Sequence, residues 1–306
     1  MGTFRLATRG SPLARRQTDL VAAALRAGHP DLDVEVVVVR TKGDDLTAPL
    51  DQIGGQGVFV TEVEAAVADG RADAAVHSAK DMTSVMAEGL AFGAFPSRAD
   101  ARDGLVGCTL SDLPPGGVIA TGSARRRAQL AYLRPDLSFT EVRGNMERRV
   151  SIGEGGTVSA VVVAVAAMER LGWMDRLTDI LAPIDVLPQA GQGAIAVQCR
   201  ADDEATCRLL ATIDHETTHR AVVAERAVLA ALGGSCTLPV GAWAEVDPAT
   251  SRIQLHGLLA SGDGRVVIRM SRFGDDPEAL GAEVAHALLV EGGGSGLEGF
   301  TSLAPA

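Results

Sequence analysis

Short runs of β-branched and small apolar residues alternate with helix-forming stretches through the first two thirds of the chain, and this alternation restricts its fold more than any other feature. The clearest run is Val34–Val39. Further strands are predicted at 74–77, 118–120, 160–165 and 194–197, with helices between them at 12–26, 58–68 and 124–133. Strands that alternate with helices predict parallel α/β sheets. Because the runs are apolar nearly throughout, we expect each sheet to be covered on both faces.

Changes in composition near 97–103 and 187–193 indicate that the chain passes twice between two lobes. The length of 306 residues also exceeds what one core usually holds. The predicted fold is therefore α/β, with two doubly wound lobes and a small α+β C-terminal domain. The predicted boundaries are 1–97 with 194–213 for the first lobe, 98–193 for the second, and 214–306 for the C-terminal domain, with a flexible tail from about 292.

The composition argues against several classes of protein. The net charge is −11 and aromatic residues make up 3%, so no nucleic-acid partner is expected. No apolar segment reaches about 18 residues, and the first residues lack the apolar run of a signal peptide, so we expect a cytoplasmic protein with no membrane partner. The spacing of Cys108, Cys199, Cys207 and Cys236 matches no common zinc pattern, and no metal is predicted. Cys199 and Cys207 are the only close pair.

Cys236 stands in a Gly-Gly-Ser-Cys-Thr sequence just after the helix predicted at 217–232. Glycines commonly end helices, and a cysteine in such a turn is a thiol that a ligand can reach. The alternative interpretation is a small, half-buried cysteine without a chemical role.

Two segments place a strand, a turn of small residues and a helix in succession, which presents backbone N–H groups to an anion. In the first, Arg9 precedes Ser11, a good N-cap. In the second, Ser123 precedes Arg125 and Arg126. Positive charge in the first turn of a helix opposes the helix dipole, so this second segment indicates a bound anion. The alternatives are an ordinary capped helix and a solvated basic face.

Lys80 and Asp81 come directly after the strand predicted at 74–77. Ligands of open α/β sheets bind at the carboxyl ends of strands, so both side chains are candidates for a site. A carboxylate there is suited to stabilising a developing cation or passing a proton. The alternative is a Lys-Asp pair in an ordinary loop.

Short motifs follow one another in a fixed order from Thr3 to about Glu245. They lie at 7–14, 41–44, 55–60, 74–81, 122–126, 143–145, 169–172, 191–194, 224–226 and 234–241. In this order they resemble the hydroxymethylbilane synthase family, also called the porphobilinogen deaminase family. The chain departs from that pattern at Met82-Thr83, Gly122, Arg148 and the glycine-rich segment 151–156.

The resemblance implies a transferase of tetrapyrrole (porphyrin and haem) biosynthesis. Such an enzyme joins four porphobilinogen molecules head to tail on a dipyrromethane cofactor, with loss of ammonia, and water then releases 1-hydroxymethylbilane. The resemblance further implies that Cys236 holds the cofactor through a thioether bond and that Asp81 is the catalytic carboxylate. The other cofactor-binding residues that it implies are Lys80, Asp81 itself, Thr121, Ser123, Arg125, Arg126 and Gly144. The substrate-binding residues that it implies are Arg9, Ser11, Phe59, Arg143, Arg149 and Arg170.

The resemblance also implies that the two doubly wound lobes are similar to periplasmic-type binding proteins. The alternative function is a non-catalytic or divergent anion-binding protein on the same two-lobed scaffold. Cys236 and Asp81 favour the enzyme, because a binding protein needs neither a covalent anchor nor a carboxylate that faces anions. We expect a monomer whose partner is the small-molecule substrate. Neighbouring residues on a helix face different ways, so Arg149 is expected to face the ligand and Arg148 the solvent.

Overall fold

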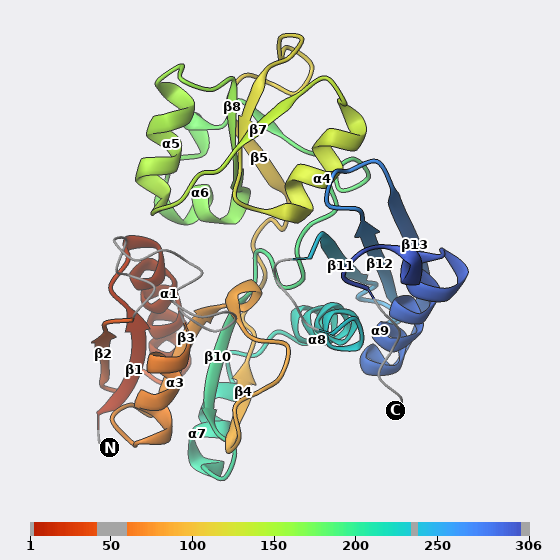
Figure 1. Cartoon of the computed structure of the whole chain (residues 1–306). Coiled ribbons are helices and arrows are strands. Elements are labelled where there is room, and N and C mark those ends of the chain that lie inside the picture. Colours follow the sequence, from red (N-terminus) through yellow and green to blue (C-terminus); the bar gives the residue numbers. More distant parts are fainter. Residues whose placement is uncertain (1–2, 42–59, 234–237, 301–306) are drawn as a thin grey trace. The chain divides into compact units, whose positions relative to one another are not determined.

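A computed structural model describes residues 3–41, 60–233 and 238–300 of the chain (Figure 1). These residues form three sheets. The chain packs as two compact units, one of residues 1–99 with 194–219 and one of residues 100–193 with 220–306. The second unit therefore contains both the second lobe and the C-terminal residues, and the three-domain boundaries expected from the sequence stay a prediction.

The first unit contains a five-stranded sheet built from both of its segments. In spatial order its strands are β2 (Val34–Val39), β1 (Phe4–Arg9), β3 (Ala74–Ser78), β10 (Ile195–Arg200) and β4 (Leu90–Ala94). Its helices are α1 (Pro12–Gly28), α3 (Thr61–Ala68) and α7 (Glu204–Ala211), with a short turn η2 (Ala79–Asp81). Successive residues of a strand face opposite sides. Leu6 accordingly packs with Leu25 of α1, and Ala7 packs with Val63 of α3, so both faces are buried.

The second lobe repeats this arrangement (Figure 1). In spatial order its strands are β7 (Ser138–Thr140), β6 (Val118–Ala120), β8 (Ala160–Ala164), β5 (Asp103–Gly107) and β9 (Asp179–Ile180). Its helices are α4 (Ala124–Leu133), α5 (Met146–Glu154) and α6 (Val165–Leu171), with a short turn η3 (Met174–Arg176). Val162 packs with Leu130 of α4, and Val163 packs with Val150 of α5. The mixed α/β lobes agree with the fold class predicted from the sequence.

One strand in each of these sheets is antiparallel to its neighbours, so the expectation of wholly parallel sheets is wrong. The antiparallel strands are β10 and β5, and each is the first strand after the chain passes from one unit to the other. Ile195 at the start of β10 lies opposite Ser78 at the end of β3, and Asp103 at the start of β5 lies opposite Ala164 at the end of β8. A strand that enters at the carboxyl edge of its neighbours must run against them. Both passages therefore meet the sheets at the edge where a ligand site was expected.

The C-terminal part of the second unit is an antiparallel sheet covered on one face by helices. Its elements are α8 (Glu216–Ala231), β11 (Val240–Val246), β12 (Ile253–Ala260), β13 (Val267–Gly274), α9 (Pro277–His286) and a π-helical turn η4 (Ala287–Glu291). The structure differs from the flexible tail expected from about 292, because the chain continues there in a short turn, Gly294–Gly296, to the buried Phe300. A side chain at Gly294 would clash with Leu288 and Leu259, so the glycine permits this packing.

Candidate active site

Lys80 and Asp81 lie in the turn η2, directly after β3. The turn is fixed to the neighbouring strand by a hydrogen bond of 3.0 Å from Ala79 N to Ala194 O. Lys80 is half-buried and Asp81 is exposed. Within the part of the chain that the structure describes, the Asp81 carboxylate makes no hydrogen bond or ion pair. A carboxylate that is held on a rigid turn without a structural partner is available to a ligand.

The base of this turn is joined to α1. Ser78 exchanges two hydrogen bonds, of 2.9 and 3.2 Å, with the buried amide of Gln17 on that helix. Ser11 caps the same helix, since its Oγ accepts a hydrogen bond of 3.3 Å from a backbone N–H of the first turn. Arg9 ends β1, which is parallel to β3. The structure thus brings Arg9, Ser11 and the Lys80–Asp81 turn to one edge of the first sheet.

His77 is a buried titratable group just before this turn. Burial lowers its pKa to about 4; a hydrogen bond with Gln198 acts in the opposite direction, and the charge of Arg9 lowers the pKa further. The imidazole is therefore neutral at neutral pH. No role for His77 was predicted from the sequence.

We expect His77 to make the protein less stable in mild acid. The unfolded chain binds a proton at His77 near pH 6.5, whereas the folded chain does so only near pH 4. The penalty is absent above pH 6.5 and grows as the pH falls to about 4, where it reaches roughly 3 kcal/mol of unfolding free energy. Urea denaturation at several pH values across this range should show that the unfolding free energy falls more steeply with decreasing pH for the natural protein than for His77→Gln. The control is His286→Gln at an exposed histidine, and parallel curves for the natural protein and His77→Gln would contradict the assignment.

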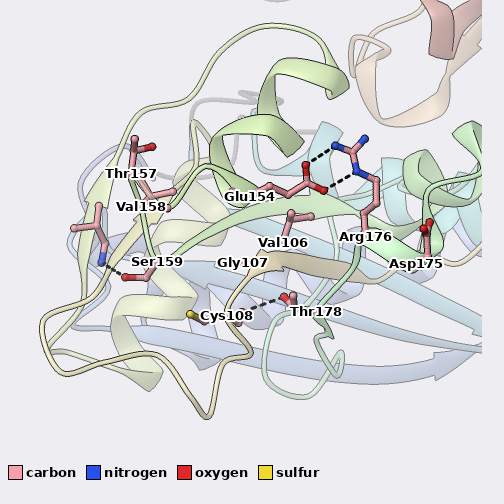
Figure 2. Close-up of a pocket in the computed structure, with 13 residues that line it drawn as sticks. Val106, Gly107, Cys108, Glu154, Thr157, Val158, Ser159, Asp175, Arg176 and Thr178 are labelled. Carbon is pink, nitrogen blue, oxygen red and sulfur yellow. Dashed lines mark hydrogen bonds and ion pairs between the residues drawn. The ribbon is translucent and has the colours of Figure 1, made fainter.

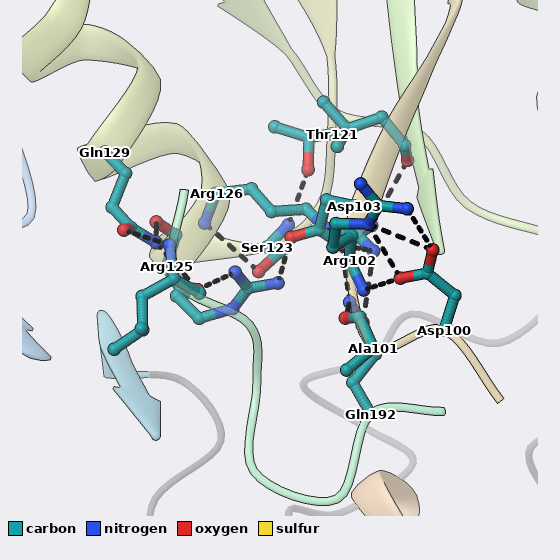
Figure 3. Close-up of polar contacts among 12 residues, drawn as sticks. Asp100, Ala101, Arg102, Asp103, Thr121, Ser123, Arg125, Arg126, Gln129 and Gln192 are labelled. Carbon is teal, nitrogen blue, oxygen red and sulfur yellow. Dashed lines mark hydrogen bonds and ion pairs between the residues drawn. The ribbon is translucent and has the colours of Figure 1, made fainter. Parts of the chain in front are cut away.

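In the second lobe, Asp103, Arg125 and Arg126 form a buried ion cluster (Figure 3). Arg125 Nη2 lies 2.8 Å from Asp103 Oδ2, and Arg126 Nη2 lies 2.7 Å from Asp103 Oδ1. All three side chains are at most 7% exposed. Gln192 Nε2 donates hydrogen bonds of 2.8 Å to Asp103 Oδ1 and 2.7 Å to Ala101 O. The cluster therefore joins β5, α4 and the segment that precedes β10.

The two arginines keep Asp103 ionised. Burial alone would raise the pKa of Asp103, but the charges of Arg125 and Arg126, with hydrogen bonds from Arg126 and Gln192, hold that pKa well below its usual range. Two guanidinium groups share one carboxylate, so the cluster has one positive charge in excess. The sequence indicated an anion beside the basic first turn of α4, and the structure supplies one from the chain itself, Asp103.

The two arginines of the cluster differ in their remaining hydrogen-bonding capacity. Arg126 donates to Asp103 through Nε and Nη2 and to Val162 O through Nη1. Arg125 donates to Asp103 and to Leu187 O, but its buried Nε has no hydrogen-bond partner among the described residues. A ligand carboxylate would compete with Asp103 at Arg126, whereas Arg125 retains a donor. Ligand binding by either residue stays a prediction.

Thr121 and Ser123 hold the turn before α4. Ser123 caps the helix, with its Oγ accepting a hydrogen bond of 3.4 Å from Arg126 N. Thr121 Oγ1 accepts one of 3.2 Å from Ser123 N. Both hydroxyl groups can still donate a hydrogen bond to an anion.

The predicted binding residues after β7 share a turn at the start of α5. Gly144 has φ +105°, a conformation that favours glycine, and its carbonyl accepts a hydrogen bond of 2.9 Å from Arg149 Nε. Arg143 is exposed and pairs with Glu141 at 2.9 Å. Arg148 is exposed, whereas Arg149 is half-buried. The neighbouring arginines therefore differ in exposure, as expected of successive positions on a helix.

Arg170, at the end of α6, is a half-buried cation. Its Nη2 donates a hydrogen bond of 2.7 Å to Gly193 O, which is the only hydrogen bond that its side chain makes with described residues. Burial lowers the pKa of Arg170 to about 10, so it remains charged at neutral pH. A half-buried guanidinium without an ion pair in the described part of the chain is suited to a ligand carboxylate.

Comparison with known proteins identifies the family. Residues 4–208 match the domain described as porphobilinogen deaminase, dipyromethane cofactor binding domain, and residues 219–290 match the porphobilinogen deaminase C-terminal domain. The chain is 43% identical over 302 residues to the porphobilinogen deaminase of Roseiflexus sp. (strain RS-1), covering 97% of this chain and 99% of that protein. The chain belongs to the porphobilinogen deaminase family.

Other porphobilinogen deaminases match over nearly their whole length. The protein of Syntrophobacter fumaroxidans is 43% identical, covering 94% of this chain and 95% of the relative, and that of Brevibacillus brevis is 41% identical, covering 96% of both. Among solved structures, a periplasmic substrate-binding protein of an ABC transporter from Coxiella burnetii is 16% identical, with a TM-score of 0.41 over 69% of this chain and 92% of that one. That likeness is too distant to indicate a function.

The described residues fit the acidic cofactor named for the porphobilinogen deaminase family. A dipyrromethane with acetate and propionate groups needs cationic and hydroxyl donors. Arg170 and Arg125 Nε supply donors that the described residues do not use, and the hydroxyl groups of Thr121 and Ser123 lie at the same sheet edge as Arg125. No group of three or more His, Cys, Asp or Glu side chains among those residues could hold a metal ion.

Two predicted site residues, Cys236 and Phe59, lie outside the described residues, so their roles stay predictions. Two others were missed. Asp103 and Gln192 anchor the cluster. The charged segment around Asp103 was interpreted only as a lobe boundary, and Gln192 only as part of the boundary at 187–193 and of the motif at 191–194. The pair of arginines in the first turn of α4 could have indicated Asp103, because two cations at that position need a nearby carboxylate.

A separate hollow of about 710 Å³ lies in the second lobe (Figure 2). It is lined by Cys108 after β5 and by Ser159 before β8, and so it lies at the edge of the sheet opposite to Asp103. Two of its charged residues pair with each other, since Arg176 donates hydrogen bonds of 2.7 and 2.6 Å to Glu154. None of the site residues predicted from the sequence lines it.

Proposed function

We propose that this porphobilinogen deaminase family member is a hydroxymethylbilane synthase that joins four porphobilinogen molecules with loss of ammonia and releases 1-hydroxymethylbilane. The observation that carries the proposal is Asp81, an exposed carboxylate without a partner among the described residues, on a sheet edge that also presents Arg9 and Lys80. Bound dipyrromethane, held by Cys236, would supply the pyrrole carbon on which the chain grows.

Asp81 is proposed to stabilise the positive charge that forms on the substrate. Loss of ammonia from the substrate's aminomethyl group leaves a positively charged pyrrole, and a fixed carboxylate stabilises that charge and accepts a hydrogen bond from the pyrrole N–H. The hydrogen bond from Ala79 N to Ala194 O fixes the turn, and the hydrogen bonds between Ser78 and Gln17 fix its base. Preorganisation of this kind requires no rearrangement at the moment of reaction. An anion-binding protein without catalysis would gain nothing from a carboxylate in this position.

The cationic residues are proposed to hold the acetate and propionate groups. At the first sheet these are Arg9 and Lys80, with Ser11 as a neutral hydroxyl donor, and in the second lobe they are Arg125, Arg143, Arg149 and Arg170. The net charge of −11 makes such clusters local features of an acidic protein. The proposal includes a cytoplasmic monomer without a nucleic-acid partner. Among the described residues, no helix is long and apolar enough to cross a bilayer.

The cofactor attachment is tested by the intact mass of the purified protein. We expect the natural protein and Cys108→Ser to be heavier than their sequences by one dipyrromethane, and Cys236→Ser to have its sequence mass and no activity. Cys108 is the matched control because it is a free cysteine away from the predicted site. An unmodified natural protein that still produces 1-hydroxymethylbilane would refute the thioether at Cys236.

A second test concerns the paired arginines of α5. Arg149→Leu is expected to lower kcat/KM for porphobilinogen by about 10- to 100-fold, since a hydrogen bond to a charged group is worth roughly 1.5–3 kcal/mol. Arg148→Leu, at the neighbouring exposed position, is the control and should leave kcat/KM nearly unchanged. Partly elongated enzyme can be followed on native gels. An equal loss in both variants would show that Arg148 also contacts the growing chain.

A further inference from the structure

Cys199 and Cys207 lie next to each other in the first unit, although neither belongs to the predicted site. Their Sγ atoms are 3.7 Å apart. Cys199 lies on β10 and is fully buried, whereas Cys207 lies on α7 and is half-buried. Cys108, the other cysteine in the described ranges, has no sulfur neighbour there.

The contact is set by rigid elements rather than by loose side chains. Asp203 caps α7, with Oδ1 accepting a hydrogen bond of 3.0 Å from Thr206 N, and it also pairs with Arg200 at 2.6 Å. This tight turn brings the first half of α7 back over the end of β10. On the other side Gly93 leaves room for the sulfur, because a Cβ there would lie 3.1 Å from Cys199 Sγ. The two thiols are therefore held in van der Waals contact.

We propose that Cys199 and Cys207 form a reversible intrachain disulfide with small disulfide oxidants such as glutathione disulfide. The half-buried Cys207 reacts first. Its thiolate attacks one sulfur of the oxidant, forms a mixed disulfide and releases one glutathione thiolate. Cys199 then loses its proton and attacks Cys207 Sγ, and the second glutathione leaves as a thiolate that takes up this proton. Two protein thiols are oxidised, and one glutathione disulfide is reduced to two glutathiones.

The surroundings of Cys199 determine how the reaction depends on pH. Burial raises the pKa of the Cys199 thiol to about 12, with a further contribution from its hydrogen bond with Cys207. Because only the thiolate attacks a disulfide, closure of the bridge is the slow step at neutral pH and becomes faster as the pH rises. The mixed disulfide on Cys207 should accumulate before the bridge at pH 7.

The bridge requires a small movement of α7. A disulfide bond is about 2.05 Å long, so the sulfurs must approach each other from their 3.7 Å contact. Cys199 is fixed by strand pairing on both sides, opposite Ala74 and Ala91. The helix carrying Cys207 is therefore the part that moves. Cys199 lies near the end of β10, away from Ile195 at the Asp81 edge, so the bridge should leave turnover unchanged.

The test uses the purified holoenzyme in glutathione redox buffers at pH 7 and pH 8.5, with acid quenching, alkylation of free thiols and tryptic digestion without reduction. We expect peptides 177–200 and 201–208 to be joined by a disulfide that dithiothreitol reverses, with faster closure at the higher pH. Cys199→Ser should stop at the mixed disulfide on Cys207, Cys207→Ser should yield neither product, and Cys108→Ser should behave as the natural protein.

Several results would overturn the proposal. One is a mixed disulfide on Cys207 that persists at pH 8.5 while Cys199 remains a free thiol. That free thiol would be detected by its alkylation after denaturation. Others are a bridge from either residue to Cys108 or Cys236, and modification of Cys199 ahead of Cys207. Far-ultraviolet circular dichroism checks that each variant is folded. If Cys199→Ser is unstable, Cys207→Ser at the half-buried position still decides which thiol reacts first. Since the readout is a peptide mass, the outcome does not depend on the proposed activity.

Discussion

Asp81→Asn is expected to lower kcat by about 10²- to 10³-fold while the covalently bound cofactor remains in place. The amide is nearly isosteric with the carboxylate but carries no charge, so it loses the stabilisation of the cation formed when ammonia departs. Asp81 is exposed and has no partner among the described residues, so its replacement should not unfold the protein. Because the lost interaction strengthens in the transition state, kcat should fall more than substrate affinity.

The measurement is steady-state formation of 1-hydroxymethylbilane, together with intact mass to confirm the cofactor. Glu88→Gln is the matched control, since Glu88 is another exposed carboxylate in the first unit, without a predicted role. It should retain normal turnover. A kcat for Asp81→Asn close to that of the control would remove Asp81 from the mechanism.

Asp103→Asn is expected to destabilise the protein by about 3–5 kcal/mol of unfolding free energy, because it leaves two buried guanidinium groups without their counter-ion. The control is Asp100→Asn in the same segment. Asp100 pairs with Arg102 at 2.6 Å, but their side chains are 26% and 43% exposed, and a pair of this kind is worth about 0–1 kcal/mol. Urea denaturation of both variants checks the difference.

A related expectation follows from the pKa of Asp103. The pKa of Asp103 is lower in the folded chain than in the unfolded chain. Ionised Asp103 therefore stabilises the fold fully at a pH above its unfolded-state pKa, and this stabilisation is lost as the pH falls through its folded-state pKa. Equal unfolding free energies for Asp103→Asn and Asp100→Asn would show that the buried cluster is unimportant for stability.

The secondary structure could be predicted largely from local patterns. Val34–Val39 and the helix at 124–133 occur with the predicted bounds, because apolar runs and a capping serine are local signals. The direction of β10 and β5 could not be predicted this way. It depends on where each strand enters its sheet, and that is set by the passage of the chain between units rather than by the residues of the strand.

The candidate site shows the same division. Ser11, Ser123 and Asp81 were found because helix caps and strand ends have short-range signatures. The partner of Arg125 and Arg126 was not found, because Asp103 belongs to a different strand and its pairing arises only after folding. The sequence predicted a bound anion beside α4, which stays a prediction; the carboxylate that the structure places there is the chain's own Asp103.

The position of β10 has a consequence for synthesis of the protein. β10 pairs with both β3 and β4, so the first sheet cannot be completed until residue 200 has left the ribosome. The strands of the second lobe all lie between Asp103 and Ile180 and can pair earlier. Domains usually fold in order from the N-terminus during translation. Here we expect the reverse. The inserted lobe should fold first, while the N-terminal strands β1 to β4 stay accessible to chaperones until β10 is made, about a hundred residues after β4.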